Sequence, residues 1–281
     1  MKLAFSSLAC PDRSWREVIR LAADLGFDGV EWRLVDGAVV DGSFAPKLAD
    51  EIGRVTSEHG LGMPALDSSI ELARPPGDER DRTVHEVAAL LRTARRFGAE
   101  HLRVFVGPYP ESVPTSTARE WMFETLSRLN PVAREQGVLL AVELHSIDPG
   151  FGVRQDGTTC SEFLREVLAS DGALSHCGIQ WDVANSVAEG EDPARTWENV
   201  HRRLTYVQIK DIARGTDGRW SNMAMGTGSI PTARILEWLR ADGFSGWLSF
   251  EWEKWWQPEL DDAEIALPQF IRHVRPLLSG F

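Results

Sequence analysis

The sequence predicts an α/β fold, a closed (β/α)8 TIM barrel, on three observations. Short β-branched or apolar runs alternate with helix-period stretches along the whole chain, which is the pattern of a parallel sheet built from strand–helix units. Eight such units in 281 residues average about 35 residues each, the size of a βαβ repeat. No linker, low-complexity tract or shift in composition divides the chain, so we expect one domain over residues 1–281.

The expected strands are apolar runs that end in polar residues. In chain order they are Lys2–Ser6, Gly29–Arg33, Leu61–Leu66, His101–Val106, Val138–His145, Gly178–Asp182, Leu204–Lys210 and Trp247–Glu251. A doubly wound open sheet is the alternative arrangement of such strands. It would need a glycine-rich phosphate loop after an early strand, and the sequence contains neither GxGxxG nor GxxxxGK[ST].

The expected helices lie between these strands. They are Trp15–Leu25, Ala45–His59, Arg80–Phe97, Ala118–Gln136, Ser161–Ala169, Pro193–Arg203, Thr232–Ala241 and Asp261–Leu278. Gly26, Gly98 and Gly137 each follow the last turn of a helix, where a left-handed residue is needed. Ser14 and Ser161 mark helix starts, because a hydroxyl there can cap free backbone N–H groups.

Composition narrows the class of protein. The net charge is −12, so an acidic surface would repel phosphate backbones and we expect no nucleic-acid partner. No apolar run reaches the roughly 18 residues of a membrane span, and the N-terminus does not resemble a signal peptide. Cys10, Cys160 and Cys177 are scattered without a CxxC motif, which predicts free thiols and a cytoplasmic location.

Polar residues interrupt four consecutive strands near their C-terminal ends, the end of a barrel that carries its chemistry. They are Glu143, Asp182, Gln208 and Glu251. Each carboxylate taken singly could be a loop salt bridge or a helix N-cap. Together they would be costly to bury uncompensated, and a divalent cation would satisfy all of them at once.

The two-residue period of a strand extends this site by one layer. It places Lys210 on the same face as Gln208, and Arg33 on the same face as Glu31. The upper residue of each such pair then lies above the cation, where a substrate would bind. These residues are Arg33, His145, Lys210 and Glu253.

With these residues the sequence resembles the xylose-isomerase-like TIM barrels, the sugar phosphate isomerase/epimerase superfamily that also contains endonuclease IV. The resemblance covers nearly the whole chain and is carried by Phe5–Pro11, Leu25–Arg33, Val142–His145 and Gly246–Glu251. Its ketose 3-epimerase branch implies one divalent metal ion held by Glu143, Asp182, Gln208 and Glu251. It further implies that Glu143 and Glu251 shuttle the proton and that Asn185 and Arg214 contact the substrate.

Two positions depart from that branch. Gln208 replaces the usual histidine ligand, as in hydroxypyruvate-isomerase-type members, and Asn185 replaces a substrate histidine. The ligand set becomes all oxygen, which favours Mg²⁺ or Mn²⁺ over Zn²⁺. The change at Asn185 weakens the case for a ketohexose substrate.

The resemblance implies a metal-dependent isomerase or epimerase that acts on a small keto-sugar or related polyol ketone through an enediolate. A metal-dependent dehydratase of a keto-sugar or inosose, as in the inosose-dehydratase relatives, is the alternative, because expelling a β-hydroxyl begins with the same proton abstraction. A non-catalytic sugar- or metal-binding barrel is a further alternative. Endonuclease IV activity is not expected, since it requires three zinc ions and many histidine ligands. A homo-oligomer is compatible with the tryptophans of Trp252–Trp256, which could cover an interface as readily as a pocket.

Overall fold

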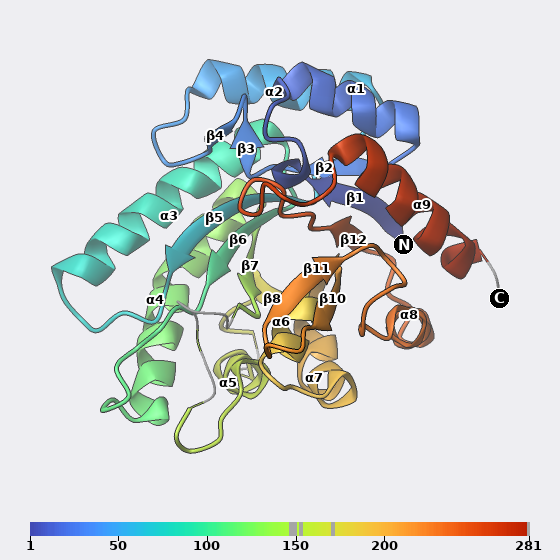
Figure 1. The fold of residues 1–281 in the computed structure, drawn as a ribbon. Helices are drawn as coiled ribbons and strands as arrows, with labels where there is room; N and C mark the ends of the chain where they lie inside the picture. Colours follow the sequence, from blue (N-terminus) through green and yellow to red (C-terminus); the bar gives the residue numbers. More distant parts are fainter. Residues whose placement is uncertain (146–150, 152–153, 170–171, 280–281) are drawn as a thin grey trace.

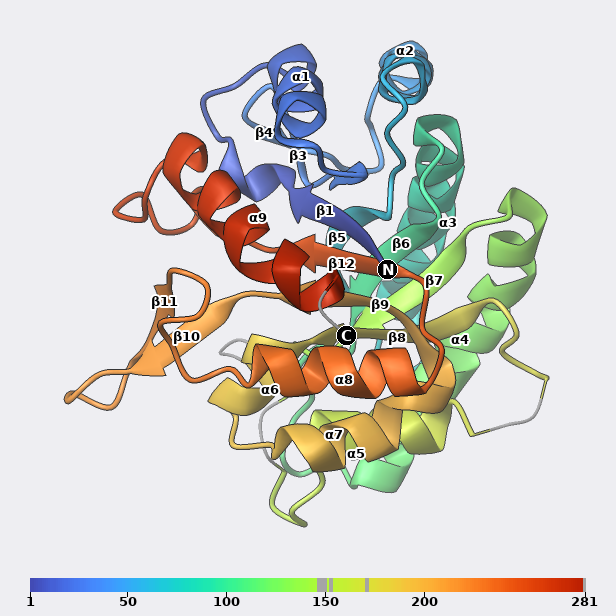
Figure 2. The same cartoon turned by 90° about the vertical axis from the view of Figure 1, so that its right-hand side faces the viewer.

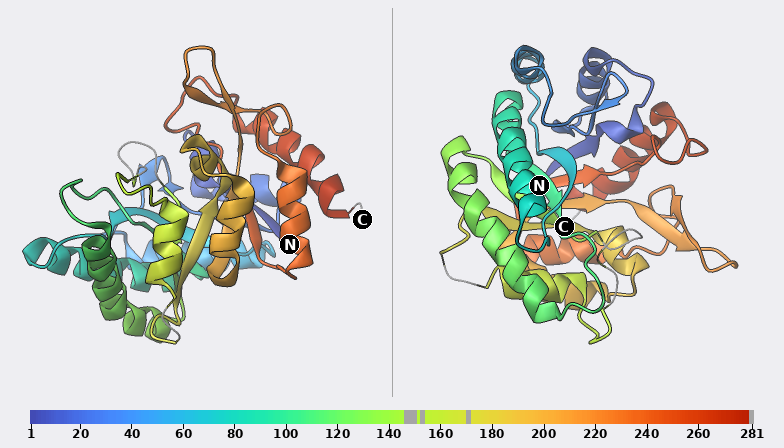
Figure 3. Two further views of the ribbon diagram at one scale, coloured as in Figure 1. Left: turned by 90° about the horizontal axis from the view of Figure 1, so that it is seen from below. Right: turned by 90° about the vertical axis from the view of Figure 1, so that its left-hand side faces the viewer.

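The computed structural model describes residues 1–145, 151, 154–169 and 172–279. Eight parallel strands form one curled sheet in the order β2-β1-β12-β9-β8-β7-β6-β5, and helices surround it (Figures 1 and 3). The first and last strands of this order meet through parallel bridges that join Gly29 to Gly62 and Trp32 to Leu66. The Val30 N–H donates to Gly62 O at 3.1 Å across this seam. The sheet is therefore closed, and the predicted (β/α)8 barrel is confirmed.

The barrel strands follow the predicted runs closely. They are β1 (Lys2–Ser6), β2 (Gly29–Glu31), β5 (Ala65–Glu71), β6 (His101–Phe105), β7 (Leu139–Glu143), β8 (Cys177–Asp182), β9 (Leu204–Ile209) and β12 (Trp247–Phe250). The third strand is the clear exception, because it begins four residues later than predicted. Pro64 has no backbone N–H to give to a ladder, so regular pairing with β6 starts at Ala65.

The helices also lie where the sequence places them. They are α1 (Trp15–Leu25), α2 (Pro46–Glu58), α3 (Asp78–Phe97), α4 (Thr115–Gln136), α5 (Cys160–Val167), α7 (Pro193–Val200), α8 (Thr232–Ala241) and α9 (Ala263–Ser279). Gly26, Gly98 and Gly137 all adopt left-handed conformations as C-caps, as predicted. Ser14 and Glu17 form a capping box at α1. Helix α5 begins one residue earlier than predicted, with Thr159 as its N-cap.

Short elements lie in the loops of the barrel, all but η2 beyond the C-terminal ends of the strands. They are η1 (Ser7–Ala9), the hairpin β3 (Leu34–Val35) with β4 (Ala38–Val39), α6 (Val183–Ala188), η2 (His201–Arg203), and the hairpin β10 (Asp211–Arg214) with β11 (Trp220–Met223). The β10–β11 hairpin projects well away from the barrel (Figure 2). Apart from η2, which falls within the predicted helix Pro193–Arg203, the sequence analysis did not anticipate these elements.

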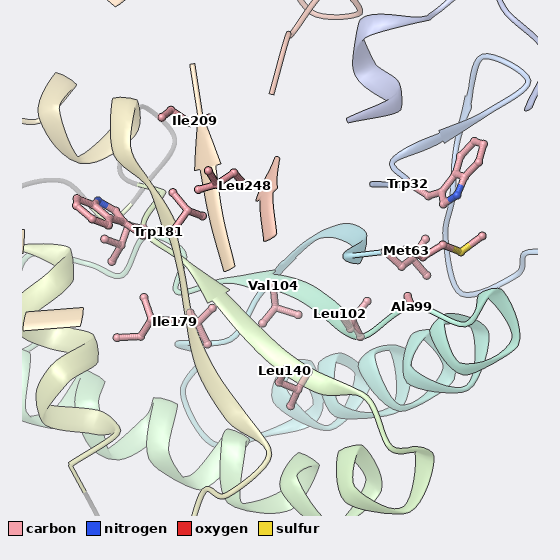
Figure 4. Packing of buried hydrophobic residues seen from close by; sticks show 14 of the residues in the cluster. Trp32, Met63, Ala99, Leu102, Val104, Leu140, Ile179, Trp181, Ile209 and Leu248 are labelled. Carbon is pink, nitrogen blue, oxygen red and sulfur yellow. The ribbon is translucent and has the colours of Figure 1, made fainter. Parts of the chain in front are cut away.

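The outward faces of the strands make the main core with the helices. Leu102, Val104 and Leu140 belong to this core and lie on two neighbouring strands beside the helices that cover them (Figure 4). Alternation along β6 then turns Arg103 inward. The barrel interior is apolar only at its floor, in a small cluster of Ala4, Ala65, Ala141, Tyr206 and Trp247. Above this floor the interior is mostly polar, whereas bulky aliphatic residues dominate most such barrels.

The floor also explains two glycines where β2 meets the third strand. A Cβ atom on Gly62 would lie 2.7 Å from the Trp247 ring, and one on Gly29 would lie 2.6 Å from the carbonyl oxygen of Gly62. Only glycine lets the two backbones and the indole approach so closely. Barrel closure and the packing of Trp247 therefore depend on the same pair of residues.

Cys10, Cys160 and Cys177 are buried free thiols, as predicted. Within the described ranges, no helix combines the length and the apolarity that crossing a bilayer requires.

Candidate active site

A cavity of about 240 Å³ opens at the C-terminal mouth of the barrel. It is lined by Leu8, Arg33, Ser69, Glu71, Arg103, Phe105, Glu143, His145, Glu251, Glu253 and Trp256. Five of these are residues that the sequence assigned to the site: Arg33, Glu143, His145, Glu251 and Glu253. Of the other predicted site residues, Asn185 and Lys210 line a smaller cavity that shares Glu253 with this one, and Asp182, Gln208 and Arg214 line neither.

Lys210 lies at the centre of the acidic cluster. Its Nζ atom is 2.5 Å from Glu251 Oε2, 3.0 Å from Asp182 Oδ2 and 3.1 Å from Glu253 Oε1. The side chain is buried, with 3% of it exposed. Burial lowers the pKa of Lys210, but the carboxylates of Asp182, Glu251 and Glu253 outweigh it and raise the pKa well above its usual value. Lys210 is therefore a buried, charged ammonium group.

Asp182 holds a second group in place beside this cation. It is the N-cap of α6, and its Oδ1 accepts from the Asn185 N–H at 2.8 Å. The Asn185 side chain then donates to Glu143 Oε1 at 3.0 Å. Asp182 therefore acts as a helix N-cap, which is one of the ordinary roles considered for carboxylates at strand ends. The cap also places Asn185 beside Glu143.

Glu143 is paired with an arginine that the sequence analysis left out of the site. Arg103 Nη1 donates to Glu143 Oε2 at 2.6 Å, and its Nη2 is 3.6 Å from Asp67 Oδ2. Burial raises the pKa of Glu143 to about 7, although Arg103 opposes that rise. A carboxyl group that titrates near neutrality can both accept and release a proton.

Gln208 reaches across the barrel interior to Glu31. Its Nε2 donates to Glu31 Oε1 at 2.5 Å, and its buried Oε1 has no hydrogen-bond partner. The contact with Glu31 thus occupies the amide nitrogen and leaves the amide oxygen available to a further partner. Burial and the neighbouring Asp67 raise the pKa of Glu31 well above its usual value.

Arg33 and His145 also line the cavity at the barrel mouth. Arg33 donates to the Asp67 carbonyl at 3.2 Å and to Ser69 Oγ at 2.6 Å. The His145 ring packs against Phe105 with centroids 4.4 Å apart. Burial, with Arg103 and Lys210 nearby, lowers the pKa of His145 to about 4, so this imidazole is neutral at pH 7.

Arg214 is not brought to the cavity. It is exposed on the β10–β11 hairpin, and its Nε donates to the Gly218 carbonyl at 3.0 Å. The family spacing that suggested a substrate contact counts residues along the chain, whereas the hairpin carries this arginine outward.

Sequence reasoning passed over Glu31, Asp67 and Arg103 as site residues. Asp67 was missed because the third strand was predicted to end at Leu66, one residue before it. Once β5 is placed correctly, Asp67 and Arg103 are register partners on neighbouring strands. Each of the three is a charged residue on the inward face of its strand, and that pattern would have identified all of them.

The donor chemistry of the four predicted ligands fits a hard divalent cation. Every donor would be an oxygen atom, and Gln208 Oε1 is buried without a partner. The Lys210 ammonium already stands between Asp182 and Glu251 as a cation in that place. Among the described residues, no three histidine, cysteine or acidic side chains are grouped so that they could hold a metal ion.

Comparisons with solved structures agree on the fold. A D-tagatose 3-epimerase-like protein is 21% identical with a TM-score of 0.77, covering 99% of this chain and 97% of its own. The IolI protein with a bound zinc atom is 17% identical with a TM-score of 0.78, covering 100% and 99%. The probable 3-DHS dehydratase AsbF from Bacillus anthracis is 14% identical with a TM-score of 0.75, covering 98% and 99%.

A search of the curated proteins found no matching sequence. The family description "Xylose isomerase-like TIM barrel" matches residues 19–272, which is most of the chain and includes every residue of the site except those of the first strand and its loop. With the closed barrel and the site at its C-terminal mouth, this match shows that the chain belongs to the xylose isomerase-like TIM barrel family.

Proposed function

We propose that this protein is a divalent-metal-dependent isomerase or epimerase of a small keto-sugar or related polyol ketone. The observation that carries the proposal is the pair of buried carboxyl groups, Glu143 and Glu251, that line one cavity from strands β7 and β12. Two strands separate β7 from β12 in the sheet order, so the two groups approach a substrate from different sides. Such a pair suits removal of a proton at one face of a carbon and its return at another.

Burial raises the pKa of both groups. The pKa of Glu143 rises to about 7 although Arg103 opposes the rise, and that of Glu251 rises well above its usual value although the Lys210 ammonium, 2.5 Å away, opposes the rise. A carboxyl group with a raised pKa can hold a proton to donate, and its ionised form can act as the base. Return of the proton to the same carbon gives an epimer, and return to the adjacent carbon gives an aldose–ketose isomer.

The cations around the cavity suit the charge that develops on the substrate. Lys210, Arg33 and Arg103 would stabilise an enediolate because donors fixed in advance cost no reorganisation during the reaction. A divalent ion held by Glu143, Asp182, Gln208 and Glu251 would polarise the carbonyl and make the neighbouring C–H more acidic. Mg²⁺ or Mn²⁺ is the ion we propose, from the all-oxygen donor set.

The size and the polar lining of the cavity favour a small, hydroxyl-rich substrate. Its volume of about 240 Å³ is at or below the lower end of ordinary ligand pockets. Charged residues make up most of its deep lining, and Trp256, 57% exposed, stands at its rim. An indole in that position offers a flat apolar face to one side of a sugar ring.

Solvent deuterium exchange tests the proposal. The protein is incubated in D₂O with Mn²⁺ and a panel of keto-sugars, and deuterium incorporation is followed by NMR. We expect the wild type to incorporate deuterium at the carbon next to the carbonyl. Glu251→Gln should abolish this exchange, and Glu58→Gln, the same change on the exposed surface of α2, should leave it unchanged.

Other outcomes would redirect the assignment. Loss of water from the substrate, detected as an unsaturated product, would favour the dehydratase reaction, since a fold neighbour carries a dehydratase name. Exchange by Glu251→Gln at the wild-type rate would place the base elsewhere, at Glu253 or His145. Absence of exchange with every sugar would instead support a binding barrel.

A further inference from the structure

The Lys210 ammonium contacts two of the four proposed metal ligands, Asp182 and Glu251. Three carboxylate oxygens surround it, from Asp182, Glu251 and Glu253, at 2.5 to 3.1 Å. Two of these residues belong to the proposed ligand set, and the third does not. Lys210 therefore neutralises ligand carboxylates that would otherwise be buried with uncompensated charge.

We propose that Lys210 is an internal competitor of the divalent ion, and that metal binding displaces its ammonium from Asp182 and Glu251 toward Glu253. This inference rests on the metal requirement in the proposed function. Two cations cannot share the same pair of carboxylates at contact distance without strong repulsion, because little solvent screens them there. Either Lys210 moves or the metal ion binds weakly.

The structure offers Lys210 a place to move. A cavity of about 70 Å³ adjoins it, lined in part by Asn185, Trp220, Asn222 and Glu253. This volume exceeds what one water molecule needs, so it can admit the end of a lysine side chain.

Glu253 is the carboxylate that would pair with the displaced ammonium group, and two amide side chains fix its position. Its Oε2 accepts from Asn222 Nδ2 at 3.1 Å and from Gln257 Nε2 at 3.0 Å, while its Oε1 already contacts Lys210 at 3.1 Å. The displaced ammonium thus keeps one ion pair throughout. Because Glu253 lines both the small cavity and the substrate cavity, the displaced cation would also lie closer to the substrate.

Gln208, which reaches Glu31 across the barrel, gives a second argument for a metal ion at this site. Gln208 Oε1 is buried and unpartnered, while its amide nitrogen is fixed by Glu31. The Lys210 ammonium forms ion pairs with carboxylates at the ends of β8 and β12, whereas Asp182 Oδ2, like Gln208 Oε1, is buried without a hydrogen-bond partner. A cation that also engaged Gln208 would satisfy a group that Lys210 leaves unsatisfied.

Metal affinity, rather than activity, tests the inference. Mn²⁺ binding to the full chain is measured by titration calorimetry for the wild type, Lys210→Met and Lys47→Met. Lys47 is an exposed lysine on α2 and serves as the matched control. We expect Lys210→Met to bind Mn²⁺ at least tenfold more tightly than the wild type, and Lys47→Met to bind like the wild type. If Lys210→Met does not fold, Lys210→Gln removes the same charge while keeping hydrogen-bond donors for the carboxylates.

Thermal unfolding gives a second readout. Without metal, the Lys210 variants should unfold at a lower temperature than the wild type, and Mn²⁺ should raise their Tm more than it raises that of the wild type. A variant that binds Mn²⁺ when the wild type does not would also support competition. Equal affinity in the wild type and the Lys210 variants would overturn the inference and leave the metal requirement intact. No binding by any of them would overturn both the inference and the metal requirement.

Discussion

Replacement of Arg103 by methionine should destabilise the protein strongly, because it leaves the buried Glu143 carboxylate without its cationic partner. Arg103 is 5% exposed and Glu143 is 1% exposed, and their atoms approach to 2.6 Å. Removing one partner of such a buried pair typically costs about 3–5 kcal/mol. We expect a loss of about that size in the free energy of unfolding at pH 8, measured by urea denaturation.

The loss should depend on pH in a defined direction. Arg103 opposes the burial that raises the pKa of Glu143 to about 7, so its removal should raise that pKa further. A carboxyl group whose pKa is higher in the folded state stabilises the fold while protonated, and this stabilisation disappears as pH rises through the folded pKa. Arg103→Met should therefore be much less destabilising near pH 5 than at pH 8.

Two further variants make this prediction specific. Arg128 pairs with Asp81 at 2.7 Å on the surface, both about half exposed, so Arg128→Met should cost only about 0–1 kcal/mol. In the double variant Arg103→Met/Glu143→Gln, a neutral amide replaces the stranded charge, and part of the stability should return. A loss in Arg103→Met equal to that in Arg128→Met, or one independent of pH, would refute the reasoning.

Three other outcomes are expected. Gly62→Ala should lower the unfolding free energy by about 1–3 kcal/mol, seen as a lower Tm, because its Cβ would overlap the Trp247 ring. Arg214→Ala should leave deuterium exchange into the substrate unchanged, since Arg214 is exposed on a hairpin; a large drop would restore it as a substrate contact. Burial lowers the pKa of His101, so the unfolded chain takes up a proton there first and stability should fall as pH drops below about 6.5. His101→Gln should show a shallower decline, measured as unfolding free energy against pH, and an unchanged slope would contradict this account.

The positions of the site residues along the chain could be predicted because strand geometry is local. A period of two sets which side chains share a face, so Lys210 follows Gln208 inward and Glu253 follows Glu251. Parallel strands in a barrel bring their C-terminal ends together, so residues that end successive strands meet at one mouth. Gly26, Gly98 and Gly137 likewise identified helix ends, because a left-handed C-cap is a property of a few consecutive residues.

The pairing of charges was decided only by the tertiary structure. Gln208 bonds to Glu31, 177 residues away in sequence, and Arg103 bonds to Glu143 on the neighbouring strand. Such contacts depend on the stagger of strands around the closed barrel and on the competition of several cations for several carboxylates. The sequence shows that these charges face inward, but the lowest free energy of the whole cluster selects their partners. For that reason the sequence predicted a cation at Asp182 and Glu251, and the fold placed the Lys210 ammonium there.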